Sequence, residues 1–281
     1  MIENNELRGL VAAQLGAMCG AGVLGADSER STSRLYASSQ ARVDFQLDAV
    51  DWYLGLADAP PRGGRTVVLT SGPPGAGKST LVGADSLSDY RRLDADRLKD
   101  HLIDRAISDG IYQDLLNTQL VDGAPIAPRE LAALVHNEST TLMADITQIC
   151  IQRHENVIVE ATLRWDDHGP DLVERFAAAE YLTMRVLSLD VPKALAQEQA
   201  LSRWWEGRTE WIDRTNRLGG RFMPPSAIES CFNIDGSSKC VENARKLHAA
   251  AEPYDLEIKL EMYERLSEGD TVHRVADEHG A

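Results

Sequence analysis

The chain has 281 residues and 43% of them are hydrophobic, which is enough for one large α/β domain with additions or for two small domains. Its formal net charge of −15 argues against a nucleic-acid partner, because the phosphate groups of DNA or RNA would be repelled. The four cysteines are scattered and form no C-x-x-C pair, so we expect reduced thiols and neither a disulfide framework nor a zinc site.

The first 62 residues precede the first expected core strand and carry two helical patterns. Apolar residues recur at helical spacing from Leu7 to Met18, and a second helical stretch covers about residues 33–56. Residues 59–64, Ala-Pro-Pro-Arg-Gly-Gly, are typical of a linker. We therefore divide the chain into an N-terminal helical extension, residues 1–62, and a main domain, residues 63–281. The simplest interpretation of the extension is that its apolar faces only cover the sheet.

The same N-terminal part contains the apolar stretch 10–24. This stretch is too short to span a membrane, and it lacks the basic lead-in of a signal peptide. We therefore expect a soluble, cytoplasmic protein with no membrane partner.

A buried strand followed by a glycine-rich loop opens the main domain. The apolar run Val67-Val68-Leu69 predicts a parallel strand, and the pattern Gly72-x4-Gly77-Lys78-Ser79 that follows is a complete P-loop. Glycines let backbone N–H groups approach a phosphate, lysine reaches the β- and γ-phosphates, and the serine hydroxyl holds Mg²⁺. We expect ATP or GTP to bind here together with Mg²⁺. The predicted nucleotide-binding residues are Gly72, Pro73, Pro74, Gly75, Ala76, Gly77, Lys78, Ser79 and Thr80, with Ser79 as the metal ligand.

Four further runs that predict strands alternate with helical segments, which is typical of a doubly wound, mostly parallel sheet of five strands flanked by helices. These runs are residues 90–98, 156–163, 181–190 and 254–260, and we expect a loose end from Ser267. Two of the runs end in polar residues at the edge where open α/β sheets bind ligands. Asp94 and Asp96 end one run, and Glu160 and Thr162 end the other. One of the two aspartates can simply cap the next helix; we predict a catalytic role for Asp96.

Two other segments carry candidate site residues. A helix predicted from Pro128 to about Arg153 places Glu138, Thr141 and Asp145 on one face, which is either a solvated face or a ligand-binding one. The stretch from Arg203 to Arg221 is rich in arginine in an otherwise acidic chain. Arginines there form ordinary surface salt bridges or a lid that neutralises charge during phosphoryl transfer, and we favour the lid.

At this point the chain resembles the zeta toxin family of P-loop kinases over about residues 65–228. The resemblance rests on the P-loop, on Leu-Asp-Ala-Asp-Arg at 93–97, on His-Asn-Glu-Ser at 136–139 and on Asn-Val-Ile-Val-Glu-Ala-Thr-Leu-Arg at 156–164. It also includes the arginine segment that ends in Gly-Arg-Phe-Met-Pro-Pro at 220–225. The P-loop alone is common to many folds, whereas the 156–164 motif is much more specific. The resemblance implies a P-loop kinase fold with ATP as the phosphoryl donor.

Zeta-like enzymes phosphorylate the 3′-hydroxyl of the amino sugar in UDP-N-acetylglucosamine, so the resemblance implies a small-molecule acceptor of the UDP-sugar type. By the same resemblance, Asp96 is the general base, Lys78 binds phosphates, and Glu160 and Thr162 line the sugar-nucleotide site. The acid on the middle helix is either Glu138 or Asp145. Arg208 and Arg221 are the pair around the transferring phosphoryl group, because their separation fits the family spacing better than Arg203, Arg214 or Arg217 does. This chain has Ala161 where many members have glycine, which leaves the acceptor open.

The resemblance also bears on partners. Zeta toxins are blocked by a separate helical antitoxin, so we expect either such a partner in trans or inhibition in cis by residues 1–62. Two other functions remain open: a phosphotransferase for another hydroxylated small molecule such as an antibiotic, and a nucleotide-dependent switch that only hydrolyses slowly. A polynucleotide kinase is disfavoured by the net charge and by the lack of a basic groove with interleaved aromatic residues.

Overall fold

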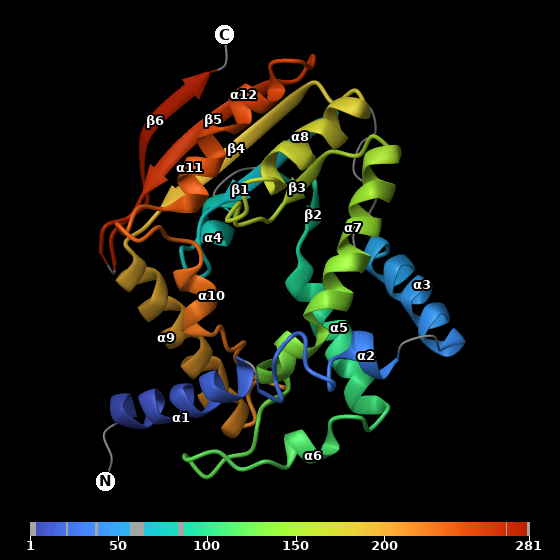
Figure 1. The fold of residues 1–281 in the computed structure, drawn as a ribbon, viewed down its shortest axis with the longest axis vertical. Coiled ribbons are helices and arrows are strands. Elements are labelled where there is room, and N and C mark those ends of the chain that lie inside the picture. The colour runs from blue at the N-terminus through green and yellow to red at the C-terminus, as the bar shows by residue number, and fades with distance from the viewer. Residues whose placement is uncertain are drawn as a thin grey trace. The chain divides into compact units, whose positions relative to one another are not determined.

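The computed structural model describes residues 4–20, 22–36, 39–56, 65–83, 87–267 and 269–279 (Figure 1). The chain forms two compact units, each assembled from three separate stretches. The helical unit consists of Met1–Gly55, Ala95–Asp145 and Ala200–Pro225, and the sheet unit consists of Leu56–Asp94, Ile146–Gln199 and Ser226–Ala281. The predicted linker at 59–64 lies outside the described residues, and the predicted boundary between residues 62 and 63 stays a prediction.

The sheet unit contains one sheet of six strands in the order β2-β3-β1-β4-β5-β6. The first five strands run parallel, and β6 pairs antiparallel with β5. Their bounds are β1 Thr66–Ser71, β2 Arg91–Leu93, β3 Val157–Val159, β4 Thr183–Asp190, β5 Glu257–Glu264 and β6 His273–His279. The predicted α/β class and mostly parallel sheet are confirmed.

The sixth strand corrects the prediction of five strands and a loose end after Ser267. Strand β6 is polar, with the sequence His-Arg-Val-Ala-Asp-Glu-His, so no apolar run marks it. It lies at the sheet edge, where only β5 gives it a partner. An edge strand can do without an apolar face, and charged residues on an edge strand discourage pairing with other chains.

Both faces of the sheet are covered, which explains the continuous apolar runs in its central strands. Val68, Ile158 and Leu187 form a buried cluster with Val82 of α4 (Lys78–Gly83) on one face. The alternate residues of β1 and β4 are buried too, because a strand points successive side chains to opposite faces. The other helices of the sheet unit are α8 His168–Ala178, α10 Pro225–Glu229, which starts at the last residue of the helical unit, α11 Lys239–Arg245 and α12 Leu247–Ala251.

The helical unit has a core of its own, built partly from the N-terminal helices. In α1 (Asn4–Cys19), Val11 and Leu15 are fully buried in a cluster that includes Tyr112 and Trp204. The other elements are α2 Thr32–Leu35, α3 Gln40–Leu54, α5 Ala95–Ser108, α6 Gln113–Leu116 and the 3₁₀ helix η1 Pro128–Val135. Helices α7 (His136–Gln152) and α9 (Lys193–Ile212) each contribute residues to both units.

Two predicted helices are interrupted in the structure. The predicted helix over 33–56 is divided into α2 and α3, and the helix predicted to begin at Pro128 starts as η1 and becomes α-helical only at His136. No described helix is long and apolar enough to cross a membrane.

Candidate functional site

The P-loop of the sheet unit has a backbone that only glycine adopts without strain. Gly72, Gly75 and Gly77 have positive φ angles of 142°, 81° and 98°. A Cβ atom on Gly72 would lie 2.7 Å from the carbonyl oxygen of Leu189, a clash with backbone that nothing nearby could relieve. The loop therefore keeps its path because of its sequence.

Residues after β3 hold the start of this loop. The Gly72 amide donates to the carbonyl oxygen of Thr162 over 3.2 Å. Thr70 at the end of β1 exchanges two hydrogen bonds with the backbone of Ala161, at 3.2 and 3.1 Å. The backbone carbonyl of Thr162 thus holds the start of the loop. The predicted role of Thr162 in the sugar-nucleotide site stays a prediction.

Lys78 folds back on the loop that carries it. Its Nζ donates to the carbonyl oxygens of Gly72, at 2.7 Å, and of Pro73, at 3.0 Å. Both acceptors are neutral, and a phosphate oxygen is a stronger, charged acceptor for an ammonium group. A phosphate group in the loop can therefore replace these two carbonyl oxygens as the acceptor for Lys78.

Ser79, the predicted metal ligand, contacts Glu160, whose predicted role in the sugar-nucleotide site stays a prediction; together the two side chains form a candidate metal site. Ser79 Oγ donates to Glu160 Oε2 over 3.2 Å, and Arg92 Nε donates to the other carboxylate oxygen. A hydroxyl and a carboxylate are ligands that Mg²⁺ prefers, and Mg²⁺ commonly takes only one or two protein ligands beside phosphates and water. Among the described residues, no group of three or more His, Cys, Asp or Glu is placed to hold a metal.

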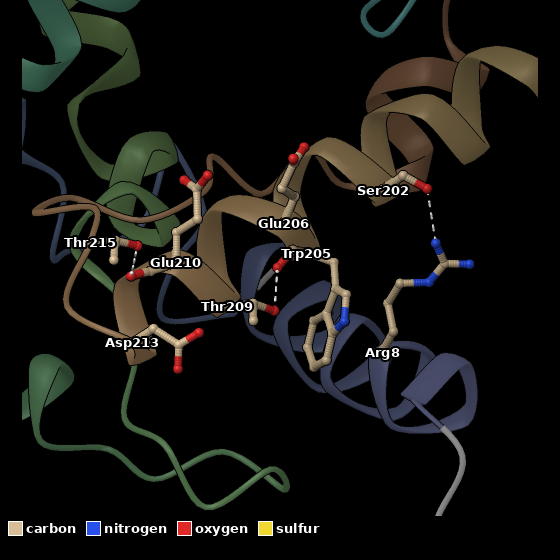
Figure 2. Close-up of a pocket in the computed structure, with 8 residues that line it drawn as sticks. All are labelled: Arg8, Ser202, Trp205, Glu206, Thr209, Glu210, Asp213 and Thr215. Atoms are coloured by element: carbon tan, nitrogen blue, oxygen red, sulfur yellow. Dashed lines mark hydrogen bonds between the residues drawn. The ribbon is translucent and has the colours of Figure 1, made fainter. Parts of the chain in front are cut away.

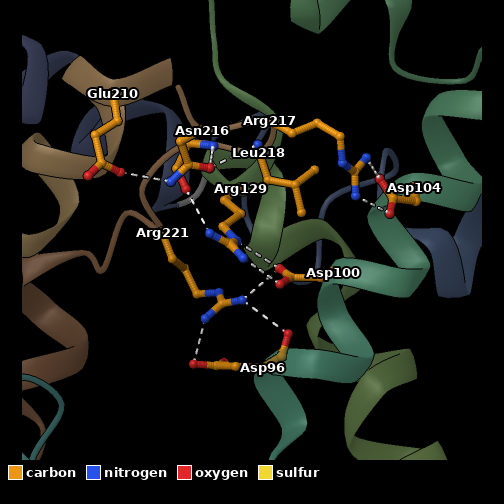
Figure 3. A network of polar contacts seen from close by, with 10 residues as sticks. Asp96, Asp100, Asp104, Arg129, Glu210, Asn216, Arg217, Leu218 and Arg221 are labelled. Carbon is orange, nitrogen blue, oxygen red and sulfur yellow. Dashed lines mark hydrogen bonds and ion pairs between the residues drawn. The ribbon is translucent and has the colours of Figure 1, made fainter. Parts of the chain in front are cut away.

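Asp96 lies in the first turn of α5 in the helical unit, paired with a predicted lid arginine (Figure 3). Arg221 Nη1 is 2.6 Å from Asp96 Oδ2, and Lys99 Nζ is 3.2 Å from Oδ1. Burial works to raise the pKa of Asp96, but the charges of Lys99 and Arg221 outweigh burial and hold that pKa below its ordinary value. The carboxylate is 48% exposed, so it is ionised at neutral pH and open to a ligand.

A second carboxylate orients Arg221. Its Nη2 donates to Asp100 Oδ1 over 2.8 Å, and Asp100 also accepts a two-pronged contact from Arg129, at 3.0 and 2.8 Å (Figure 3). The preceding residue, Gly220, packs so tightly that a Cβ would lie 2.0 Å from the Trp204 carbonyl oxygen. The chain that leads into Arg221 is therefore fixed by backbone packing, and the guanidinium is fixed by Asp100.

Arg208, the other arginine predicted to surround the phosphoryl group, lies in a different environment. Its side chain is fully buried, with contacts to Asp122 at 2.8 Å and to Glu130 at 2.8 Å, and it also donates to two backbone carbonyls. Burial raises the pKa of Glu130, even though the charge of Arg208 acts to lower it. These contacts give Arg208 a structural task in the helical unit, and its role in phosphoryl transfer stays a prediction.

The two candidate acids of the middle helix also differ. Glu138 is buried, and α3 covers it: Arg42 donates to both carboxylate oxygens, at 2.7 and 2.5 Å, and Gln46 donates over 2.6 Å. Burial acts to raise the pKa of Glu138, but the hydrogen bonds to its carboxylate, above all the one from Arg42, hold that pKa below its ordinary value. Asp145 is exposed. The contact with α3 was not predictable from the sequence, because 96 residues separate Arg42 from Glu138.

A separate hollow of about 410 Å³ lies between α1 and the C-terminal half of α9 (Figure 2). Arg8 spans it, donating to Ser202 Oγ over 2.9 Å, and Trp205 forms part of the wall. None of the predicted site residues lines this hollow.

Comparison with known proteins identifies one family. The family model described as Zeta toxin matches residues 53–265. A solved structure from the PezAT chromosomal toxin–antitoxin system of the human pathogen Streptococcus pneumoniae is similar in fold, with a TM-score of 0.58 and 14% sequence identity. The similarity covers 84% of this chain and 81% of that one. No curated protein matches the chain in sequence.

The buried contacts of Arg208 predict a large effect on stability. Arg208→Ala leaves Asp122 and Glu130 buried without their cation, so the free energy of unfolding should fall by about 3–5 kcal/mol. Arg217→Ala is the matched control, because its contact with Asp104 is exposed and should contribute about 1 kcal/mol or less. Urea unfolding of both variants measures this. Equal stabilities would show that Arg208 does not hold the helical unit together.

Proposed function

Because the chain belongs to the zeta toxin family, we propose that it is an ATP-dependent kinase that transfers the γ-phosphoryl group to a hydroxyl of a small molecule. The acceptor that we propose is the 3′-hydroxyl of the amino sugar in UDP-N-acetylglucosamine. The observation that carries the proposal is the complete loop from Gly72 to Thr80, with its glycine-only backbone and with Lys78 held on it. An alcohol acceptor also requires an ionised carboxylate that can receive its proton, and Asp96 is such a carboxylate.

In this proposal the residues of the sheet unit bind the donor. The loop's N–H groups and Lys78 hold the phosphates, which requires Lys78 to exchange the Gly72 and Pro73 carbonyls for phosphate oxygens. Ser79 and Glu160 hold Mg²⁺, and Arg92 orients Glu160. When bound, Mg²⁺ neutralises charge on the transferring phosphoryl group.

In the helical unit, Asp96 is the proposed general base and Arg221 the proposed lid arginine. A base with a lowered pKa is adequate, because in a loose transition state the hydroxyl proton leaves late. Arg221 has two carboxylate partners, so it keeps Asp100 when it leaves Asp96 to meet developing charge. Thr162 and Glu138 are proposed to contact the acceptor.

We also propose restraint in cis. Both oxygens of the Glu138 carboxylate accept hydrogen bonds from α3, through Arg42 and Gln46. Glu138 therefore cannot contact an acceptor until these hydrogen bonds break. Both residues precede the part of the chain that matches the family model. A helical antitoxin in trans is the alternative restraint, and the origin of the PezAT structure in a toxin–antitoxin system supports looking for one.

The first prediction separates binding from transfer. Asp96→Asn should retain MgATP binding within about threefold and lose phosphoryl transfer by a factor of about 10²–10⁴, because only proton acceptance is removed. Lys78→Ala should weaken both. Titration of MgATP and a radiolabelled transfer assay measure the two effects. Asp104→Asn is the control and should behave as the wild type, because Asp104 pairs with the exposed Arg217. Full transfer by Asp96→Asn would exclude Asp96 as the base.

The lowered pKa of Asp96 predicts the pH profile. The carboxylate stays ionised down to its ordinary range of about 4, so its protonation should cause no loss of transfer between about pH 6 and 8. Lys99 is the largest charge that lowers this pKa, so Lys99→Met should move the acidic limb of kcat toward higher pH. An acidic limb that does not move in the variant would show that it belongs to another group.

The acceptor is tested by a screen. With γ-labelled ATP, UDP-N-acetylglucosamine should become labelled, and mass spectrometry should find one phosphate added to its amino sugar. Hydroxylated antibiotics form the comparison panel. Label on an antibiotic alone would contradict the proposed acceptor but support the proposed kinase activity. ATP hydrolysis unaffected by any acceptor would favour a nucleotide-dependent switch.

The restraint by α3 predicts activation by point substitution. Deletion of the N-terminal residues is unsuitable, because Val11, Leu15 and Tyr53 belong to the buried core. The double variant Arg42→Met and Gln46→Met removes both contacts with the buried Glu138, which should lower the free energy of unfolding by about 3–5 kcal/mol, as for Arg208. In the variant that stays folded, kcat/KM for the acceptor should rise about tenfold. Asp44→Asn on the exposed side of α3 is the control. A folded double variant with unchanged or lower kcat/KM contradicts restraint by α3.

A further inference from the structure

Arg265, the residue directly after β5, contacts the P-loop at the same edge of the sheet. Its Nη2 donates to the carbonyl oxygen of Ala76 over 2.7 Å and also to the side-chain oxygen of Gln199 on α9. Its backbone amide donates to the Asp190 carbonyl over 3.1 Å, at the end of β4. The guanidinium is thus anchored by the sheet and aimed at the loop, 189 residues away in sequence.

The partners of Arg265 are unusual for this chain. Arg91, Arg92 and Arg185 of the same sheet each pair with a glutamate. Within the described part of the chain, Arg265 contacts only neutral oxygens, and its buried Nε has no hydrogen-bond partner. A partly buried cation without a carboxylate is costly to keep. The charge of Arg265 is therefore left uncompensated beside the loop that binds phosphates.

The contact with Arg265 sets the orientation of the Ala76–Gly77 peptide. No described peptide bond is cis, so the carbonyl of Ala76 and the N–H of Gly77 point in opposite directions. Holding the carbonyl toward Arg265 turns the Gly77 N–H away from the guanidinium. Gly77 has a φ of 98°, and a Cβ on it would lie 3.4 Å from Arg265 Nη2, so the arginine packs directly against the loop backbone.

We propose that Arg265 is a positioning residue for the nucleotide: it fixes the Ala76–Gly77 peptide so that the Gly77 N–H is presented to the phosphates. This inference rests on the proposed nucleotide binding and extends the site to the residue after β5. A flexible glycine peptide would otherwise rotate freely, and the nucleotide would have to order it on binding. Arg265 acts before the nucleotide arrives, through the loop and not through the reacting atoms.

The test is direct binding of MgATP, without any acceptor, to the full chain and to Arg265→Gln. The dissociation constant should rise about 10- to 100-fold, the expected effect of losing a hydrogen bond from a charged donor. The melting temperature without nucleotide should stay near that of the wild type. In the transfer assay KM for ATP should rise while kcat at saturating ATP changes little, which is the signature of lost uniform binding. Arg265→Lys should recover part of the affinity, because an ammonium group can also donate to Ala76.

Arg274→Gln is the matched control, because Arg274 lies on β6 and contacts Glu261 at the sheet edge. It should leave the affinity for MgATP unchanged. An affinity of Arg265→Gln equal to that of the wild type would overturn the role of Arg265 and leave the kinase proposal intact. Absence of MgATP binding to the wild type itself would overturn both. If Arg265→Gln does not fold, Arg265→Lys decides the question, since unchanged affinity together with unchanged KM contradicts the proposal.

Discussion

The structure depends on a backbone path that only glycine can follow. At Gly72 the chain leaves β1 with a φ of 142°, so close to the Leu189 carbonyl that no side chain fits. The loop is held on three sides by neighbouring backbone or side chains: Thr162 accepts from its first amide, Lys78 folds over it, and Arg265 binds its Ala76 carbonyl. A loop fixed in this way needs little further ordering when a ligand binds.

Arginine is used in three distinct ways in this acidic chain. Arg208 is buried between two carboxylates and Arg42 is buried against one, and both hold elements together. Arg221 pairs with two partly exposed aspartates, which orient it and leave it able to change partners. Among the described residues, Arg265 has only neutral acceptors. The number and burial of the carboxylate partners, more than position in the sequence, separate a structural arginine from one that is available to a phosphate.

Local patterns in the sequence predicted the parts of the fold that depend on local constraints. The P-loop and the strand before it follow from glycine spacing and an apolar run, and the parallel sheet follows from alternating apolar and helical segments. Strand β6 was missed because it is polar and gains its strand structure from pairing with β5. The predicted helix does start at Pro128, but its first turns are 3₁₀ and not α-helical.

In the candidate site, the pairing of Asp96 with Arg221 involves two predicted residues. The contacts of Arg42, Arg92 and Arg265 join residues 68 to 189 positions apart, and no spacing rule signals them. Sequence spacing likewise could not distinguish the buried Arg208 from Arg221.

The most direct measurement is a crystal structure of the full chain with Mg²⁺ and a non-hydrolysable ATP analogue. The account predicts the phosphates in the loop from Gly72 to Thr80, the metal on Ser79, the Lys78 ammonium moved from the Gly72 and Pro73 carbonyls to phosphate oxygens, and Arg265 still on Ala76. A nucleotide bound elsewhere, with Lys78 unmoved, would contradict it.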